Sequence, residues 1–230
     1  MIAPLHSAPA AFAGGLVEVA GGVHAWLQPN GVLGESNACL VVGEGASLLV
    51  DTLWDPSLTR RMLAAMAPLT ADAPIATLVN SHSDGDHWWG NQELAGAEIV
   101  ATDAAAAVMR EESPAQMQRF GGLARALRLA GASPVPYPRR GDVRAIAAYV
   151  GGTLAPFAFG DVWLVRPTRT FSGELALDAG GREVRLIEVG PAHTPGDLIA
   201  WVPDARVAIA ADILFIGVTP IMWAGRVGAG

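Results

Sequence analysis

The sequence predicts an α/β (α+β) fold, and three observations support this fold class. Hydrophobic residues make up 51% of the 230 residues and charged residues 16%, so the chain can bury a sizeable core. The 27 Gly and 16 Pro suit a fold with many short strands and turns. Short apolar runs also alternate with segments whose apolar residues recur at helical spacing. We expect a single domain over residues 1–230.

The first hundred residues predict a meander of strands that merges into a β-α-β unit. Residues 55–66 carry helix signals, because Asp55 and Pro56 stand at the first turn and apolar residues follow at helical spacing. Strands are expected at the apolar runs 16–28 (a pair broken at Gly21-Gly22), 37–42, 46–50, 75–79 and 98–102.

The middle of the chain predicts a helical insertion at about 104–160. Residues 104–132 and 142–154 are rich in Ala, Arg, Leu and Met at helical spacing, and 133–138 between them is rich in Pro. The second half of the fold, 161–230, returns to strands. These are expected at 170–171, 175–177, 183–189, 198–202 and 207–211, with a hairpin turn at 178–181.

Charge and composition exclude several functions. A net charge of −7 argues against nucleic-acid binding, which needs a clustered basic surface. The chain has no Lys, which excludes a Lys nucleophile. The single Cys39 lies in an apolar run, so we expect a core thiol and no disulfide or Cys-rich zinc site. No signal peptide or membrane span is evident, so we expect a cytoplasmic protein. The expected partner is a small-molecule substrate.

The segment after the apolar run 75–79 is the strongest chemical signal. Within six residues it offers two imidazoles and two carboxylates, His82, Asp84, Asp86 and His87. Neutral imidazoles and ionised carboxylates can converge on one or two divalent cations. The alternative is a capped turn in which Asp86 begins a helix near Trp88.

Two later turns add candidate ligands. His193 stands between small residues after the strand at 183–189, and Asp212 follows the strand at 207–211. Sites in layered α/β folds lie at the carboxyl ends of strands, where all three turns are expected. Taken singly, His193 could instead be a hydrogen-bonded structural residue.

The order of these turns resembles the metallo-β-lactamase superfamily. Its hallmark is His-x-His-x-Asp-His after a strand, then a His in a Gly/Thr/Pro-rich turn, then an Asp that ends a strand. The similarity extends from about Val17 to Phe215 and includes the strand that ends at Asp51. It implies a four-layer αββα sandwich with a metal site at one edge, between two related halves.

The resemblance implies a metal-dependent hydrolase with one or two divalent ions, zinc above all. His82 and His193 would bind the first metal. Asp86 and His87 would bind the second, and Asp212 would bridge both. Bound metal would activate a water nucleophile and polarise a carbonyl, and Asp86 would help to orient the water.

Asp84 departs from the family pattern, because it stands where the family has its second His. A carboxylate can still ligate, and its hardness shifts the preference towards Fe or Mn. The flavodiiron branch resembles this, so a di-iron redox protein is an alternative, although that branch carries a flavin domain for which this chain has no room. The other alternative is that Asp84 points away from the site.

The family's last His ligand has no counterpart, because no His follows His193. The ending 223–230 lacks the helix and strand that would complete the second half, so the C-terminal part is expected to be shortened. The second metal would then be held by Asp86, His87 and Asp212 plus water, or completed by a neighbouring subunit in a homo-oligomer. An inactive or binding-only member is the remaining alternative.

Trp88 and Trp89 follow the motif directly and are candidate substrate-pocket residues, with helix packing as the alternative. The insertion is expected to cover the site as a lid, and its apolar residues form either a substrate pocket or ordinary core. They are Met109, Met117, Phe120, Leu123, Leu127, Tyr149, Phe157 and Phe159. A pocket of this kind predicts a small apolar ester, thioester or lactone as substrate.

Overall fold

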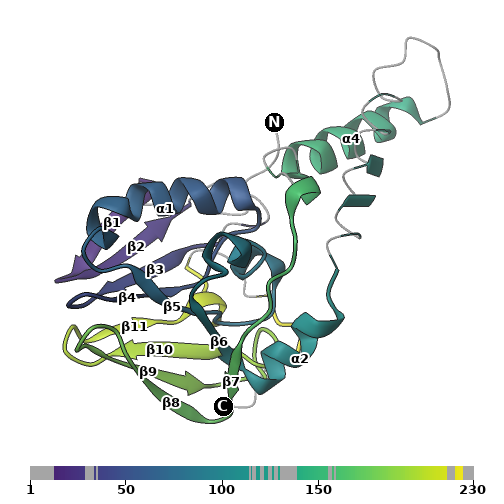
Figure 1. Ribbon diagram of the computed structural model, residues 1–230. Helices are drawn as coiled ribbons and strands as arrows, with labels where there is room; N and C mark the ends of the chain where they lie inside the picture. Colours follow the sequence, from purple (N-terminus) through teal and green to yellow (C-terminus); the bar gives the residue numbers. More distant parts are fainter. Residues whose placement is uncertain are drawn as a thin grey trace.

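Figure 1 shows a computed structural model of the chain, in which two β-sheets face each other. The structure describes residues 13–28, 34, 36–113, 115, 118–119, 122–123, 126, 129, 139–154, 157, 159–216 and 221–224. Helix α1 lies over the outer face of the larger sheet, and α4 projects away from both sheets. Two facing sheets with several helices confirm the predicted fold class.

The larger sheet has seven strands in sequence order. They are β1 (Gly15–Ala20), β2 (Val23–Leu27), β3 (Ala38–Val42), β4 (Ser47–Val50), β5 (Ile75–Val79), β6 (Glu98–Thr102) and β7 (Arg169–Phe171). Strands β1 to β4 pair antiparallel, whereas β4 to β7 are parallel neighbours. Because parallel strands end at the same edge of a sheet, the residues after β4, β5 and β6 meet there.

The smaller sheet is an antiparallel meander in the order β11-β10-β9-β8. Its strands are β8 (Glu174–Asp178), β9 (Glu183–Glu188), β10 (Leu198–Val202) and β11 (Val207–Ile209). Burial alternates along β10, so Leu198, Ala200 and Val202 face inward. They share one core with Val41 and Val79 of the larger sheet. This core fixes how the loops at the site edge approach one another.

The helices begin where side chains cap their first turns. The Asp55 carboxylate accepts a hydrogen bond from the Leu58 N–H (2.8 Å) at the start of α1 (Pro56–Thr70). The Thr102 hydroxyl accepts one from the Ala105 N–H (3.1 Å) at the start of α2 (Asp103–Glu111). The remaining described α-helix is α4 (Arg140–Leu154). No described helix is both long and apolar enough to span a membrane.

Several sequence expectations can be compared with the structure. Strands β5, β6 and β10 have the predicted bounds, and Cys39 is buried as expected, which raises its pKa to about 12 with a smaller contribution from the charge of Asp51. The strand expected at 207–211 ends earlier, because Ala211–Ile213 forms a 3₁₀ turn. After β7 the helices and strands of the described residues are β8 to β11 and one 3₁₀ turn. Residues 217–220 and 225–230 lie outside the described part, so the shortened C-terminus stays a prediction.

Candidate metal centre

The loops at the edge of the two sheets bring all six predicted ligands together. His82, Asp84, Asp86 and His87 follow β5, His193 lies between β9 and β10, and Asp212 follows β11. The ring centroids of His82 lie 4.1 Å from His87 and 5.0 Å from His193. The imidazoles therefore form one cluster, although the chain separates them widely.

The carboxylates lie against the Nε2 atoms of these rings. Asp84 Oδ2 is 2.9 Å from His193 Nε2, and Asp212 Oδ2 is 3.6 Å from the same atom. His87 Nε2 is 3.3 Å from Asp212 Oδ1 and 3.8 Å from Asp86 Oδ2. The three imidazoles are buried, whereas the three carboxyl side chains are 22–34% exposed. The site is closed on its histidine side and reachable on its carboxylate side.

Two buried nitrogens in this cluster lack hydrogen bonds. Nε2 of His82 and Nε2 of His87 have no hydrogen-bond partner among the described residues. A buried polar atom without a partner is unfavourable by about 1–3 kcal/mol. Divalent cations bound in the cluster would give both nitrogens a partner, so the residues present fit a metal site.

The opposite nitrogen of each ring is held by the protein, as is usual for metal-binding histidines. His82 Nδ1 contacts Ser81 Oγ (2.8 Å), and His87 Nδ1 contacts Asp51 Oδ2 (2.9 Å). His193 Nδ1 donates to the carbonyl of Ile221. Each contact turns Nε2 towards the cluster.

Two sets of three residues could each hold a metal ion, because the ligand atoms within each set lie within 4.8 Å of one another. One comprises His82, Asp84 and His193, which is the predicted first site with Asp84 included. The other combines Asp51 with His82 and His87. Asp51, however, is bonded to Nδ1 of His87, so it faces the side of the ring away from the cluster. We therefore regard Asp51 as an outer residue that orients His87.

Asp51 contacts the cluster from outside and was not among the predicted site residues. Its φ of 67° lies in the left-handed region, which is uncommon for a non-glycine residue. Its carboxylate accepts from Ser81 N (2.7 Å) and Ser81 Oγ (2.6 Å) as well as contacting His87. The available signal was an Asp that ends a buried strand just before the motif.

A buried amide network fixes the backbone of the motif. The carbonyl of His87 accepts from the Thr52 N–H (2.9 Å) and from Asn80 Nδ2 (3.3 Å). Asn91 Nδ2 donates to Asn80 Oδ1 (2.8 Å). The expected helix near Trp88 does not form. Gly85–His87 is a 3₁₀ turn with Asp86 inside it, so the capping alternative for Asp86 was wrong.

The turn that carries His193 is organised by Asp197. Its carboxylate accepts from Thr194 N (2.9 Å), Thr194 Oγ1 (2.9 Å) and Ala192 N (3.1 Å). Gly196 lies against α2, where an added Cβ would come within 2.3 Å of the Ala105 nitrogen. Only glycine permits this approach, which places His193 opposite the Asn80–His87 loop.

The pKa values of the imidazoles differ. Burial lowers the pKa of His82 well below its usual range, and the neighbouring His87 adds to this. Burial also opposes the charged form of His87, but Asp212 and other carboxylates outweigh it and raise that pKa well above its usual range. For His193 burial lowers the pKa, but the hydrogen bonds to Asp84 and Ile221 and the charges of Asp84 and Asp212 together outweigh it, and the pKa rises to about 9.

Among the carboxyl groups, Asp86 stands apart. Burial raises its pKa to about 6, and the charges of Asp212 and Asp84 add to this against His87. Burial also opposes the charged form of Asp212, but the charge and hydrogen bond of His87 together with the charges of His82 and His193 outweigh it and hold that pKa well below its usual range. Asp86 is therefore protonated more readily than Asp212.

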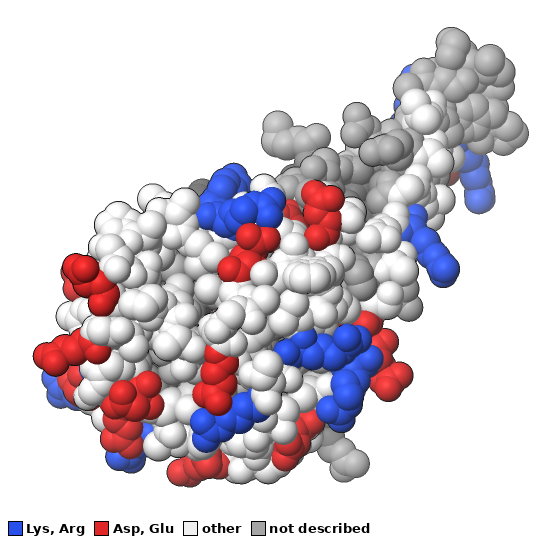
Figure 2. Space-filling view, in the orientation of Figure 1, with Lys and Arg blue, Asp and Glu red and all other residues white. Residues whose placement is uncertain are grey.

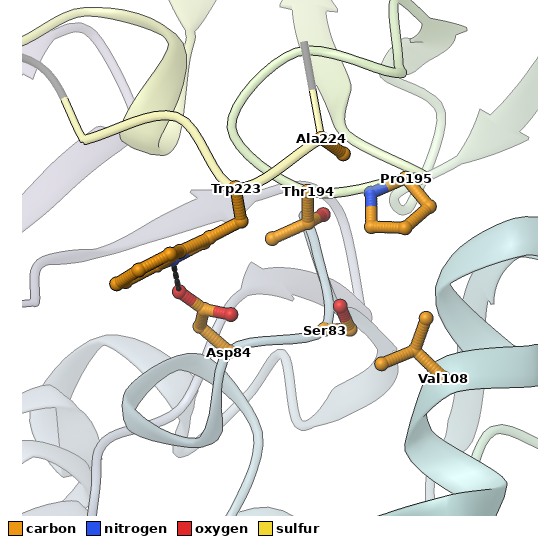
Figure 3. Close-up of a pocket in the computed structure, with 7 residues that line it drawn as sticks. All are labelled: Ser83, Asp84, Val108, Thr194, Pro195, Trp223 and Ala224. Atoms are coloured by element: carbon orange, nitrogen blue, oxygen red, sulfur yellow. Dashed lines mark hydrogen bonds between the residues drawn. The ribbon is translucent and has the colours of Figure 1, made fainter.

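A cavity of about 280 Å³ opens beside Asp84 (Figure 3). Val108 of α2 and Pro195 lie across it from one another, and Trp223 and Ala224 form another wall. The indole N–H of Trp223 donates to Asp84 Oδ2 (3.1 Å). Trp223 was not among the predicted site residues, because it lies in none of the three motif turns.

The prediction that Trp88 and Trp89 line a substrate pocket does not agree with this structure. They are 0% and 3% exposed and pack with Trp54, Met109 and Phe159. The Trp88 N–H donates into the protein, to the Ser83 carbonyl (2.9 Å). Both indoles belong to the core, as the packing alternative held, and the cavity is walled by a different tryptophan.

Of the apolar residues predicted for the lid, those that the structure describes do not form the cavity either. Phe157 also packs against Trp54, whereas Leu123 and Tyr149 are exposed. None of these residues lines the cavity. Met117, Phe120 and Leu127 lie outside the described residues.

A family model described as the metallo-beta-lactamase superfamily matches residues 31–228. No curated protein sequence matches the chain at a significant level. The matched residues include strands of both sheets and all six clustered residues.

The solved structures with a similar fold include two proteins described as beta-lactamases and one described as an alkylsulfatase. A metallo-beta-lactamase from Pontibacter korlensis is 14% identical with a TM-score of 0.53, over 85% of this chain and 69% of that one. A beta-lactamase domain protein from Burkholderia ambifaria is 15% identical with a TM-score of 0.60, over 93% and 62%. An inverting sec-alkylsulfatase from Pseudomonas sp. is 20% identical with a TM-score of 0.52, over 83% and 30%. Such low identities show a shared fold and no more.

Proposed function

Because the chain belongs to the metallo-β-lactamase superfamily, we propose that it is a metal-dependent hydrolase that cleaves an ester, thioester or lactone-type bond. Membership supports metal-dependent hydrolysis in general. The observation that carries the proposal for this chain is the pair of buried Nε2 atoms of His82 and His87. They have no hydrogen-bond partner among the described residues and face a group of carboxylates.

His82, Asp84 and His193 would hold the first cation. Asp86 and His87 would contribute to a second cation. Asp212, which lies near the imidazoles of His87 and His193, would be the shared ligand. When bound, a divalent cation lowers the pKa of a water ligand and polarises a carbonyl. We propose zinc, while the hard ligand Asp84 also suits iron or manganese.

The chain's own residues prepare this chemistry. Ser81, Asp51 and the Ile221 carbonyl hold the Nδ1 atoms, so that each imidazole directs its Nε2 into the cluster. The Asp86 carboxylate lies at the open side of the cluster and is assigned to orient the attacking water. Its raised pKa suits a group that accepts a proton from that water.

The cavity beside Asp84 supports a small, apolar substrate. Carbon-rich side chains, Val108, Pro195, Trp223 and Ala224, supply most of its walls. Its volume of about 280 Å³ lies near the lower end of the range for small-molecule sites. On the face shown in Figure 2, acidic and basic side chains are interspersed, which gives no basic surface for a nucleic acid.

A di-iron redox protein is the second candidate, because Asp84 does face the cluster, 2.9 Å from His193 Nε2. Metal analysis separates the two proposals. Zinc with chelator-sensitive hydrolysis supports the hydrolase, whereas bound iron with reductase-dependent oxygen consumption supports the redox protein.

The test of the hydrolase proposal uses the purified full chain. Its metal content is measured, and hydrolysis of short-chain esters, thioesters and lactones is assayed with and without a chelator. We expect activity that the chelator removes and added zinc restores. Folded protein that neither contains nor takes up a divalent metal would contradict the proposal.

Asp86→Asn supplies the site variant, and Asp72→Asn at an exposed position is its matched control. We expect Asp86→Asn to lower the rate by about 10²–10⁴-fold, the usual contribution of a proton-transferring group. A cation that binds without turnover in the unmodified chain would identify a binding-only member instead.

A further inference from the structure

Residues Ile221 and Trp223 contact the side of the cluster formed by His193 and Asp84. The carbonyl of Ile221 accepts a hydrogen bond from His193 Nδ1, and the backbone N–H of Trp223 donates to the His193 carbonyl (2.7 Å). The Trp223 indole N–H donates to Asp84 Oδ2 (3.1 Å), as the dashed line in Figure 3 shows. These three hydrogen bonds all reach candidate ligands of the first site.

Core packing does not explain the position of Trp223. Its side chain is among the exposed large hydrophobic groups, at 69% of its full exposure. An exposed indole gains little from burial, so its hydrogen bonds fix its place. An indole N–H donates and cannot act as a ligand, so Trp223 acts on the site through Asp84.

Asp84 needs such a partner more than an imidazole would. Its carboxylate is 34% exposed and can bind a cation through one oxygen or through both. Two donors reach Oδ2 in the described part of the chain, His193 Nε2 at 2.9 Å and the Trp223 indole at 3.1 Å. Once His193 Nε2 binds a cation, it can no longer donate to Asp84. The indole N–H is then left to hold the carboxylate.

We propose that Trp223 is a positioning residue of the first metal site, whose indole N–H holds the Asp84 carboxylate so that it binds one divalent cation together with His82 and His193. This rests on the metal site of the proposed function. The contacts of Ile221 and Trp223 therefore support ligands of this first site. The indole thus supports a ligand that itself departs from the family pattern.

The test measures the affinity of the full, metal-depleted chain for Zn²⁺ by competition with a chelating dye. Trp223→Phe keeps an aromatic side chain and removes the N–H. We expect its affinity for the first zinc to fall by about 10- to 100-fold, as for other outer-shell partners of metal ligands. Trp163→Phe, at another exposed tryptophan, is the matched control and should leave the affinity unchanged.

A second background identifies Asp84 as the group that Trp223 acts through. Asp84→His installs an imidazole that the indole is not needed to hold, so adding Trp223→Phe to it should change the affinity little. In the original background, the visible spectrum of bound Co²⁺ should also change with Trp223→Phe, because the carboxylate is freed to bind differently.

Two results would overturn the proposal. One is an unchanged affinity and Co²⁺ spectrum in Trp223→Phe, and the other is an equal loss of affinity in both backgrounds. If the unmodified chain binds no divalent cation at all, the proposed function fails and this inference falls with it. A failure of Trp223→Phe to change binding leaves the proposed function intact.

Discussion

At the scale of single residues, Asp51 shows how local strain supports the site. Its backbone has a φ of 67°, a conformation that most residues avoid, at the end of strand β4. That conformation lets one carboxylate reach both Ser81 and His87, at 2.6–2.9 Å. The side chain is 2% exposed, so these contacts are made away from water.

We expect Asp51→Asn to weaken metal binding by about 10- to 100-fold, because the amide cannot accept from all three donors in the same way. The metal-free protein should also lose about 1–3 kcal/mol of unfolding free energy, since a buried donor is left unpaired. Zinc titration and urea unfolding in chelator measure the two effects. Wild-type values for both would show that Asp51 does not orient His87.

Asp51 and Trp223 also mark the limit of prediction from sequence at this scale. The six candidate ligands could be named because they stand in three recognisable turns after apolar strands. Trp223 could not, because its hydrogen bond to Asp84 joins positions 139 residues apart. Nothing near Trp223 in the sequence announces that contact. Trp88 and Trp89 were predicted at the pocket from proximity in the chain, whereas the core buries both.

At the scale of elements, the His193 turn depends on one buried carboxylate. Asp197 is 2% exposed and gathers the backbone of Ala192 and Thr194 around it. The turn is joined to the other ligand loop, because Leu198 N donates to the Ser81 carbonyl (2.9 Å). The position of His193 therefore depends on a residue that never contacts the cluster.

Asp197→Ala should lower the free energy of unfolding by about 2–4 kcal/mol, because several hydrogen bonds to a charged group are lost together. Zinc affinity should fall as well, since His193 is no longer held in place. Chemical denaturation of the metal-free protein and zinc titration are the measurements. Asp72→Ala, at an exposed position, serves as the control.

Directly after helix α2 lies a half-buried acid, Glu112. Burial raises the pKa of Glu112 to about 7, and the charges of Asp84 and Asp86 add to this against the hydrogen bond from Trp88. A carboxyl whose folded pKa is raised destabilises the fold once pH exceeds its unfolded value near 4.5, and fully above about 7. The charged form is the unfavourable one here.

In metal-depleted protein, Glu112→Gln should therefore stabilise the fold more at pH 8 than at pH 4.5. Urea unfolding at both pH values measures this. Glu111→Gln, one residue earlier and exposed, is the matched control and should show no such difference. An identical stability change of Glu112→Gln at both pH values would contradict the expectation.

Elements were more predictable than their contacts. The strands at 75–79, 98–102 and 198–202 agree with the structure, because each is a short apolar run bounded by turn residues. The 3₁₀ turn at Ala211–Ile213 was missed, because it continues the apolar run of β11 and only backbone geometry distinguishes it. Apolar patterning places an element, whereas its last residues depend on the tertiary contacts there.

At the scale of the whole molecule, the candidate metal centre joins the two sheets. Ligands after β5 belong to the larger sheet, while His193 and Asp212 follow β9 and β11 of the smaller one. A cation bound between them would link the sheets at one edge, in addition to the shared apolar core.

Metal should therefore raise the thermal stability of the chain. At a free zinc concentration 100 times the dissociation constant, binding contributes about 2.7 kcal/mol. Differential scanning calorimetry with zinc and with chelator measures this, and hydrogen exchange should slow in the His193 turn. Equal melting temperatures in the two conditions would speak against a cation between the sheets.

The wide spacing of the ligands also sets the order in which the molecule is completed during translation. Strands β1 to β6 pair with their neighbours along the chain, so this part of the larger sheet can assemble as it leaves the ribosome. His193, Asp212 and Trp223 emerge more than a hundred residues after His82. The nascent chain can therefore form this part of the sheet before all residues of the candidate metal centre have been synthesised. A cation would therefore bind after this part of the sheet has formed.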